Sequence, residues 1–183
     1  MKKIIFCAFL VTCQMSYAEP VVSVKTTYYK VTGSTPNAIR KDMNKKRSGK
    51  YDAYTNWNVT WRFNTAKNKN KDCEIKDIKV ALDIKFILPQ WKADRSVGDD
   101  LKEHWNNYYT ALIDHENQHK DIAIEMAHEI EEVLNELGAT KDCNYLKKTA
   151  NDTANKVLKD YKRKQNDFDK DTNHGINDGA VFP

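Results

Sequence analysis

The chain has 183 residues, of which 40% are hydrophobic and 31% charged, with 30 Lys and Arg against 26 Asp and Glu. This length is typical of one domain, and no stretch rich in Pro, Gly or Ser divides it. A formal net charge of +4, with both signs interspersed, lacks the concentrated positive charge of a nucleic-acid-binding surface, so we expect no nucleic-acid partner.

The first eighteen residues have the features of an export signal. Two lysines give a positive start, residues 4–11 form a short apolar run, and residues 16–18 (Ser-Tyr-Ala) place small side chains where a signal peptidase cuts. The apolar run is too short to be a stable membrane anchor. A lipoprotein signal ending at Cys13 is the alternative, although the threonine before that cysteine matches it poorly. We therefore predict a signal peptide over residues 1–18, export to the periplasm or the extracellular medium, and a single domain over residues 19–183.

Removal of the signal would leave two of the four cysteines, Cys73 and Cys143. Two cysteines in an exported domain most simply form one disulfide. A zinc site built on cysteine is disfavoured because neither has a second ligand nearby at zinc-ribbon spacing. The bridge would tie the start of a strand to the region just after the long helix described below.

Three strands and one short helix are predicted in the first half of the domain. Residues 21–31 are rich in β-branched and aromatic side chains, and residues 54–63 form a second strand. Residues 78–88 alternate apolar and polar side chains before a proline ends the strand. A Thr-Pro pair opens the short helix, residues 36–43. We expect the last two strands to form a hairpin with the first strand alongside, in a small antiparallel sheet.

Two short basic clusters fall in predicted loops, at Lys45-Lys46-Arg47 and at residues 67–71. Charged runs of this kind are most often solvated turns. Contact with an anionic envelope or wall polymer is the alternative.

A long amphipathic helix is predicted over residues 99–137. Its buried stripe advances in steps of three and four residues, through Leu101, Trp105, Tyr108, Leu112, His115, His119, Ile122, Met126, Ile130, Val133 and Leu137. A straight helix of this length would span ~60 Å, against ~30–40 Å for a compact domain, so we expect a break before His115. A final helix, residues 143–167, folds back along it. The resulting class is α+β, with the sheet packed on the long helix and the C-terminal helix.

The most informative motif is His115-Glu116-Asn117-Gln118-His119. Two imidazoles in a buried stripe need a partner that offsets their desolvation. Core histidines bonded to a carboxylate or carbonyl would satisfy that need. A shared Zn²⁺ ion is the alternative we favour, because histidines four apart on a helix direct two ring nitrogens to one ion and the intervening glutamate lies beside its open position.

The third zinc ligand is sought where the chain returns to the motif. Glu125 lies ~9 Å further along the helix and is a weak candidate. An antiparallel final helix returns the chain to the level of the motif near residues 162–167, just before Asp169, Asp171 and His174. We favour His174 as the ligand, with Asp169 as the partner that orients a ligand ring, and keep Asp169, Asp171 and Glu125 as alternatives. Gly175 would allow a close backbone approach.

The chain also resembles a bacterial family of predicted secreted zinc-dependent proteases, still classed as a domain of unknown function. The resemblance covers nearly all of residues 19–183, and its tail usually carries Tyr where this chain has Phe168. It implies a zincin-like peptidase and leaves the substrate open. The residues that carry it are Tyr28-Tyr29-Lys30-Val31-Thr32-Gly33, Thr55-Asn56-Trp57-Asn58-Val59-Thr60-Trp61, Leu88-Pro89-Gln90-Trp91, the His115–His119 motif, Cys143 with Leu146, Phe168-Asp169, Thr172-Asn173-His174-Gly175 and Gly179.

These observations predict a zincin-like zinc metallopeptidase that acts on a peptide or protein. Zn²⁺ would be held by His115, His119 and His174, and Glu116 would be the general base. The strand over residues 78–88 either aligns an extended peptide or is an ordinary core strand. Candidates for stabilising the oxyanion are Tyr108, Tyr109 and Tyr161. The alternative function is a non-catalytic envelope or wall-binding protein that keeps zinc for stability.

Overall fold

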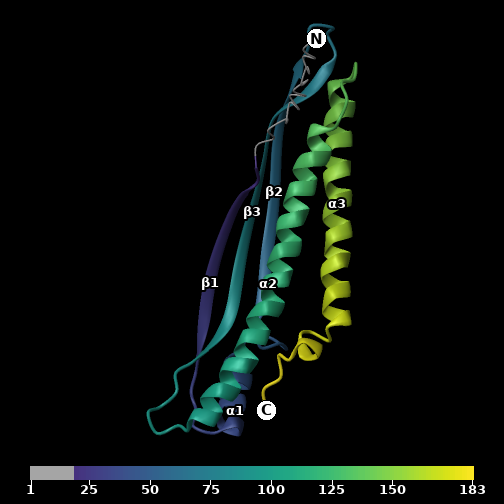
Figure 1. Ribbon diagram of the computed structural model, residues 1–183. Helices are drawn as coiled ribbons and strands as arrows, with labels where there is room; N and C mark the ends of the chain where they lie inside the picture. Colours follow the sequence, from purple (N-terminus) through teal and green to yellow (C-terminus); the bar gives the residue numbers. More distant parts are fainter. Residues whose placement is uncertain (1–18) are drawn as a thin grey trace, which may run out of the picture.

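The computed structural model describes residues 19–183, and the predicted signal peptide lies outside this range. The fold is α+β, as predicted: one small sheet and three α-helices (Figure 1). The elements in chain order are β1 (Val21–Val31), α1 (Pro36–Lys46), β2 (Tyr54–Lys67), β3 (Cys73–Trp91), α2 (Asp99–Asn135), α3 (Cys143–Asp171) and the short 3-10 helix η1 (Ile176–Asp178).

The sheet is mixed, whereas an antiparallel one was predicted. Its strand order is β1-β3-β2, with β2 and β3 forming the expected antiparallel hairpin. β1 pairs with β3 in parallel, in a register from Val21 opposite Ala81 to Val31 opposite Trp91. The parallel pairing arises from the position of α1, which follows β1 and stays at the end of the sheet where β1 finishes (Figure 1). β2 therefore begins at that same end of the sheet. β2 therefore runs back against β1, and β3, after the hairpin, runs with β1.

The central strand β3 extends beyond the prediction at both ends. It covers 19 residues and continues through Pro89, which was expected to end it. The last β3 residue that pairs with β2 is Ile87. A proline is tolerated beyond that point because one side of the strand no longer needs a ladder hydrogen bond.

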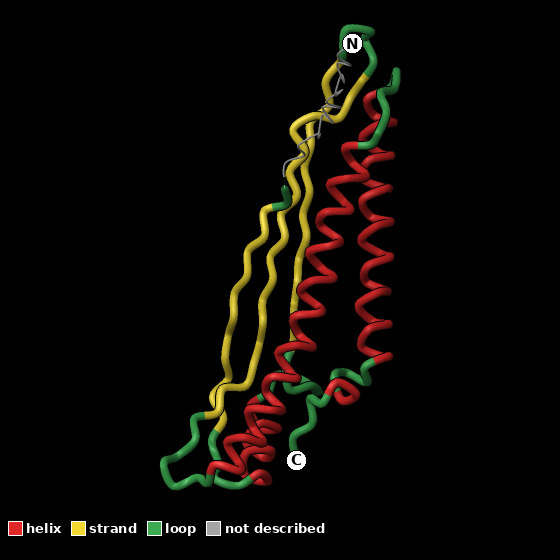
Figure 2. Tube along the Cα trace, in the orientation of Figure 1, coloured by secondary structure: helices red, strands yellow, loops and turns green. Residues whose placement is uncertain are grey.

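Helix α2 is unbroken, so the predicted break before His115 is wrong. It has 37 residues, or about 55 Å at 1.5 Å per residue. The break was expected on the assumption of a compact domain, but the molecule is elongated. Figure 2 shows α2 and α3 running side by side along the long hairpin of β2 and β3. The hairpin gives the helix a partner of similar length, and no kink is needed.

The core lies between the sheet and α2. Alternate residues of β3 are buried on the face toward the helix, namely Val80, Leu82, Ile84, Phe86 and Leu88. Most of the predicted stripe of α2 is buried in the same core, α2 contacts β3, and α3 packs against α2 (Figure 1). This arrangement brings the start of β2, the middle of α2 and the end of α3 to one place, where the candidate site lies.

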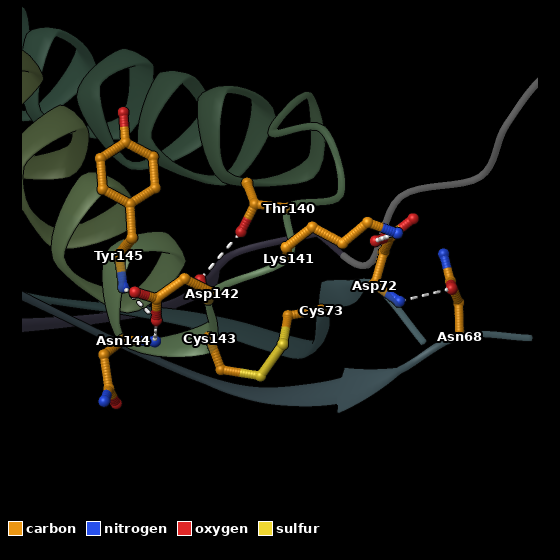
Figure 3. Close-up of a disulfide and its surroundings, with 9 residues drawn as sticks. All are labelled: Asn68, Asp72, Cys73, Thr140, Lys141, Asp142, Cys143, Asn144 and Tyr145. Atoms are coloured by element: carbon orange, nitrogen blue, oxygen red, sulfur yellow. Dashed lines mark hydrogen bonds and ion pairs between the residues drawn. A yellow bond between two sulfur atoms is a disulfide. The ribbon is translucent and has the colours of Figure 1, made fainter. Parts of the chain in front are cut away.

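The far end of the molecule is closed by the predicted disulfide between Cys73 and Cys143, whose Cα atoms are 5.2 Å apart. Figure 3 shows it beside the start of α3, where Asp142 accepts hydrogen bonds from the backbone N–H groups of Asn144 and Tyr145. A backbone bridge between Cys73 and Thr140 adds a second tie. Within residues 19–183, no helix combines the length and apolar character needed to cross a membrane.

Candidate metal centre

Two histidines on successive turns of α2 face each other at a buried site. His115 and His119 are 4% and 9% exposed, and their rings meet nearly at right angles with centroids 4.8 Å apart. Their Nε2 atoms lie 3.2 Å apart. Because residues four apart share one face of a helix, the spacing of the motif is enough to bring these two nitrogens together.

Asp169, near the end of α3, completes a group of three ligand atoms. Its Oδ1 lies 3.1 Å from His119 Nε2 and 3.4 Å from His115 Nε2. Tetrahedral zinc with bonds of about 2.0–2.1 Å needs its ligands about 3.3–3.4 Å apart. The three atoms therefore match one triangular face of such a coordination sphere. We call His115, His119 and Asp169 the ligand triad.

Gln165, one turn before Asp169 on α3, orients the ring of His119. Its side-chain nitrogen donates to the His119 carbonyl at 2.8 Å, and its Oε1 is hydrogen-bonded to His119 Nδ1. Because an amide oxygen can only accept, Nδ1 carries the hydrogen and Nε2 presents a lone pair to the triad. Gln165 thus has the position of the outer partner found at metal-binding histidines.

His115 is in a comparable state. Its Nδ1 is buried and has no hydrogen-bond partner among the described residues, and the Asp178 carboxylate lies 3.5 Å from it. A hydrogen on Nδ1 would face that carboxylate, which leaves Nε2 as the lone-pair side.

The triad therefore fits a divalent metal ion. Two imidazole nitrogens and a carboxylate oxygen lie within 3.4 Å of one another, an arrangement that needs a metal ion or a proton between the lone pairs. Two histidines and one carboxylate are also a donor set that catalytic zinc sites use.

The charges of the site keep Asp169 ionised. Burial would raise the pKa of Asp169, but the neighbouring imidazoles of His115 and His119 outweigh burial and hold that pKa well below its usual value. For His119, burial would lower the pKa, and the contacts with Asp169 and Gln165 raise it instead. The carboxylate is thus in the anionic form that a metal ligand needs.

Glu116 is a buried carboxylate beside the triad and is not one of its members. It is 5% exposed, and the Thr55 hydroxyl of β2 donates to its Oε2 at 2.5 Å. Burial raises the pKa of Glu116, and the Thr55 hydrogen bond opposes part of that rise. A carboxyl group whose pKa is raised by burial is suited to accept and release a proton near neutral pH.

His174 and Asp169 occupy exchanged positions relative to the sequence-based assignment. His174 was predicted as the third ligand and Asp169 as an outer partner. In the structure His174 Nδ1 lies 3.2 Å from Asp169 Oδ1, and His174 Nε2 lies 2.8 Å from the Tyr51 hydroxyl. Tyr51 also stacks on the imidazole, with centroids 4.1 Å apart. His174 therefore contacts the triad through Asp169.

A left-handed turn after α3 explains this placement. Asn173, His174 and Gly175 have φ angles of 49°, 53° and 82°. The turn takes His174 out of the helix and lays the backbone of Gly175 against His115, where a Cβ would lie 3.1 Å from His115 Cγ. The predicted close approach at Gly175 is confirmed. At a φ of 82° and this close to His115, a glycine fits without strain because it has no Cβ.

The remaining ligand candidates lie outside the triad. The Glu125 carboxylate pairs with Lys164 Nζ at 2.5 Å on the surface of the helix pair. Asp171 is exposed at the last residue of α3. Neither offers an oxygen to the group formed by the triad.

The triad and Glu116 line a cleft of about 530 Å³. Its walls come from α1 and the segment that precedes β2, the start of β2, the middle of α2, the end of α3 and the C-terminal tail. None of the three tyrosines predicted to stabilise the oxyanion lines this cleft, and the hydroxyl of Tyr108 is used by Asp52 at 2.9 Å. The tyrosines that do line it are Tyr51 and Tyr54.

Sequence reasoning missed Thr55, Gln165 and the packing role of Phe168. The Phe168 ring stacks on His115, with centroids 4.8 Å apart, and meets His119 edge-on. For Gln165 a signal existed, because it interrupts the apolar stripe of α3 just as the two histidines interrupt that of α2. The buried residues of α3 are Leu146, Ala150, Ala154, Val157 and Gln165.

A model of one protein family, described as "Bacterial protein of unknown function (DUF922)", matches residues 26–175. The match runs from β1 to the left-handed turn after α3 and includes all three residues of the triad. No curated protein and no solved structure shows significant similarity to the chain.

Proposed function

The chain belongs to the bacterial family of unknown function DUF922, and we propose that it is an exported zinc-dependent peptidase. The observation that carries the proposal is the ligand triad, whose three donor atoms are 3.1–3.4 Å apart, with the buried Glu116 beside it. A structural zinc site normally has four protein ligands, whereas a catalytic site has three and keeps one position open. Three ligands on the wall of a cleft favour the catalytic kind.

In this proposal the ligands are His115, His119 and Asp169, and His174 supports Asp169 from outside. Bound zinc would act as a Lewis acid toward the peptide carbonyl and lower the pKa of a water molecule. Glu116 would accept a proton from the attacking water and pass it to the leaving nitrogen. Thr55 holds Oε2 of Glu116, so the proton transfers fall to Oε1.

The edge strand β2 is the proposed support for an extended peptide. Residues 78–88 were considered for this role, but they belong to the central strand β3, which pairs with both β1 and β2 over residues 81–87. β2 is at an edge of the sheet, and its residues Thr55 and Trp57 line the cleft. A peptide added to this edge by main-chain hydrogen bonds would run past the strand that contacts Glu116.

The proposed location is the periplasm or the extracellular medium, and the proposed partner is a peptide or protein substrate. A disulfide such as Cys73–Cys143 is typical of proteins that fold in an oxidising compartment. Cys143 begins α3 whereas the cleft is lined by residues near its other end, and this separation favours a structural rather than a redox role.

The proposal is tested by metal analysis combined with digestion of an unbiased peptide library. We expect about one zinc per chain, lost in the His115→Ala, His119→Ala double variant. Glu116→Gln is the matched control, because it keeps the size of the side chain and removes the base. Its zinc content and melting temperature should barely change, while cleavage should fall by about 10²–10⁴-fold.

Two outcomes would contradict the proposal. Protein that takes up no zinc on titration has no such site. Protein that holds zinc but cleaves no member of the library would favour the alternative, a non-catalytic zinc-stabilised envelope or wall-binding protein.

A further inference from the structure

Three cationic side chains line the same cleft as the ligand triad. They are Arg40 on α1 and Arg47 and Lys50 in the segment between α1 and β2. Apart from Asp169 and Glu116 at the proposed metal centre, the only acidic residue that residues 19–183 contribute to the lining is Asp52. This end of the cleft therefore has three positive charges against one negative charge.

Asp52 does not neutralise the group. Arg40 Nη1 lies 2.8 Å from both of its carboxylate oxygens, and Arg47 Nη1 lies 2.9 Å from Oδ1. Oδ2 also accepts from the Tyr108 hydroxyl at 2.9 Å. One carboxylate is thus shared between two guanidinium groups and a tyrosine, and an excess of positive charge remains.

Arg40 and Arg47 differ in what they leave free. The other two side-chain nitrogens of Arg40 donate hydrogen bonds to the backbone of the C-terminal tail. Nε donates to the Pro183 backbone oxygen at 2.9 Å, and Nη2 donates to the Phe182 carbonyl at 2.8 Å. Arg47, which is 25% exposed, uses only Nη1 in the hydrogen bonds formed among residues 19–183. Its Nε and Nη2 donors are available to a ligand in the cleft.

Lys50 is the second uncommitted cation. Its Nζ lies 5.3 Å from the centre of the Tyr51 ring and forms no ion pair within the described part of the chain. Tyr51 is the residue whose hydroxyl contacts His174. Lys50 is therefore one residue from a side chain that reaches toward the proposed metal centre.

We infer that the Arg47–Lys50 end of the cleft binds a carboxylate of the substrate, so that the protein selects acidic peptides. A guanidinium with two free donors and a nearby ammonium form a site that matches a carboxylate in both charge and geometry. The carboxylate belongs either to a Glu or Asp side chain or to the C-terminus of the peptide. The inference rests on the proposed function, since it names the substrate class of the same cleft.

The basic cluster Lys45-Lys46-Arg47 supplies a matched control. It was predicted to lie in a loop, but Lys45 and Lys46 form the last turn of α1. The predicted solvent exposure holds for both lysines, and Lys46 pairs with Asp42 at 2.7 Å. Neither lysine lines the cleft, whereas Arg47 does. Lys45→Gln therefore removes the same charge two residues before Arg47, at the end of α1, without touching the proposed site.

The test measures binding rather than turnover, using zinc-loaded Glu116→Gln protein. Three of the probes are pools of end-blocked hexapeptides that carry one fixed Glu, Gln or Lys and mixed residues elsewhere. The fourth probe is the Gln pool with its C-terminal carboxylate left free. We expect the Glu pool or the free-carboxylate pool to bind about tenfold tighter than the blocked Gln pool at low salt, with the difference reduced as salt is raised. The pool that gains identifies the source of the carboxylate.

In this background Arg47→Gln and Lys50→Gln should each remove most of the preference, and Lys45→Gln should keep it. Lys50 is exposed, so its substitution leaves the fold intact even if Arg47→Gln loosens Asp52. Equal binding of all pools, no measurable binding of any pool, or an equal loss in Lys45→Gln would overturn the inference. A preference without cleavage by the parent protein would contradict the peptidase proposal alone, and cleavage without a preference would contradict this inference alone.

Discussion

The two halves of the α2–α3 pair share one buried stripe but are held together by different interactions. In the half near the hairpin tip the stripe is apolar apart from the buried Glu131 of α2. Its apolar residues are Met126, Ile130 and Leu134 on α2 and Leu146 and Ala150 on α3. The disulfide closes that end. In the other half, the same positions of the two helices carry His115, His119, Gln165 and Asp169, and the C-terminal tail packs beside them.

The comparison shows what a polar substitution in a packed stripe requires. Apolar side chains stabilise a helix pair simply by leaving water. Buried imidazoles and carboxylates lose hydration and need partners, which here are one another, an outer amide and the proposed metal ion. We therefore expect the apolar half to depend on its covalent tie and the polar half to depend on zinc, with each half insensitive to the loss of the other's support.

Removal of the disulfide should give the largest change in stability and leave the metal centre intact. The bridge spans a sequence separation of 70 residues, for which the chain-entropy model gives about 4 kcal/mol. Cys73→Ala with Cys143→Ala should lower the free energy of unfolding by about this amount in denaturant titrations. Zinc affinity of the folded protein should not change, because Asp169 lies 26 residues, or about 39 Å, along α3 from Cys143. Loss of zinc binding in the folded variant would show that the two halves are not independent.

The second prediction separates Asp169 from His174 at the polar end. Asp169→Ala removes an atom of the triad, so zinc affinity should fall by more than the about 10–100-fold that is typical of losing an outer partner. His174→Ala should stay within that range, because His174 contacts the triad through Asp169. Competition with a chromogenic chelator measures both. The opposite ranking would restore His174 as the ligand that the sequence favoured.

The third prediction tests whether the buried Gln165 favours metal binding at the expense of the stability of the metal-free protein. Gln165→Leu extends the apolar stripe of α3 and removes the acceptor that orients His119. Zinc affinity should fall about tenfold or more, while the metal-free protein should unfold at the same denaturant concentration or a higher one. Lys164→Gln, at the exposed neighbouring position, is the control for both measurements. A large loss of stability in metal-free Gln165→Leu would mean that the amide supports the fold itself.

Local sequence patterns predicted the elements well because each pattern depends on neighbours in the chain. The alternation in β3, the stripe of α2 and the spacing of His115 and His119 are set by strand and helix geometry alone. The pairing of Cys73 with Cys143 followed from there being no other cysteine in residues 19–183. The overall α+β class was predicted correctly because it follows from the helices and strands that these local patterns define.

Apart from element ends such as that of β3 at Pro89, the errors concern how distant parts of the chain meet. The parallel pairing of β1 depends on where α1 places the start of β2, and the unbroken α2 depends on the length of the hairpin beside it. The return of α3 to the level of the motif was correctly anticipated. The position of His174 outside the triad depends on three left-handed residues, two of which are not glycine, and no local pattern signals such a turn.

The smallest expected effect compares a glycine from each end of the helix pair. Gly175 has a φ of 82°, and a Cβ there would lie 3.1 Å from His115 Cγ, so Gly175→Ala should cost about 1–2 kcal/mol of stability and weaken zinc binding by shifting His115. Gly138 lies in the α2–α3 connection near the disulfide, where an added Cβ would meet no described atom within 4 Å and φ is not positive. Gly138→Ala should therefore be neutral or stabilise by about 0.4–1 kcal/mol, because alanine restricts the unfolded chain. Denaturant titration and zinc competition of the two variants measure the difference. Equal effects would mean that the tail does not hold the polar half in place, and a loss of zinc affinity confined to Gly175→Ala would show that it does.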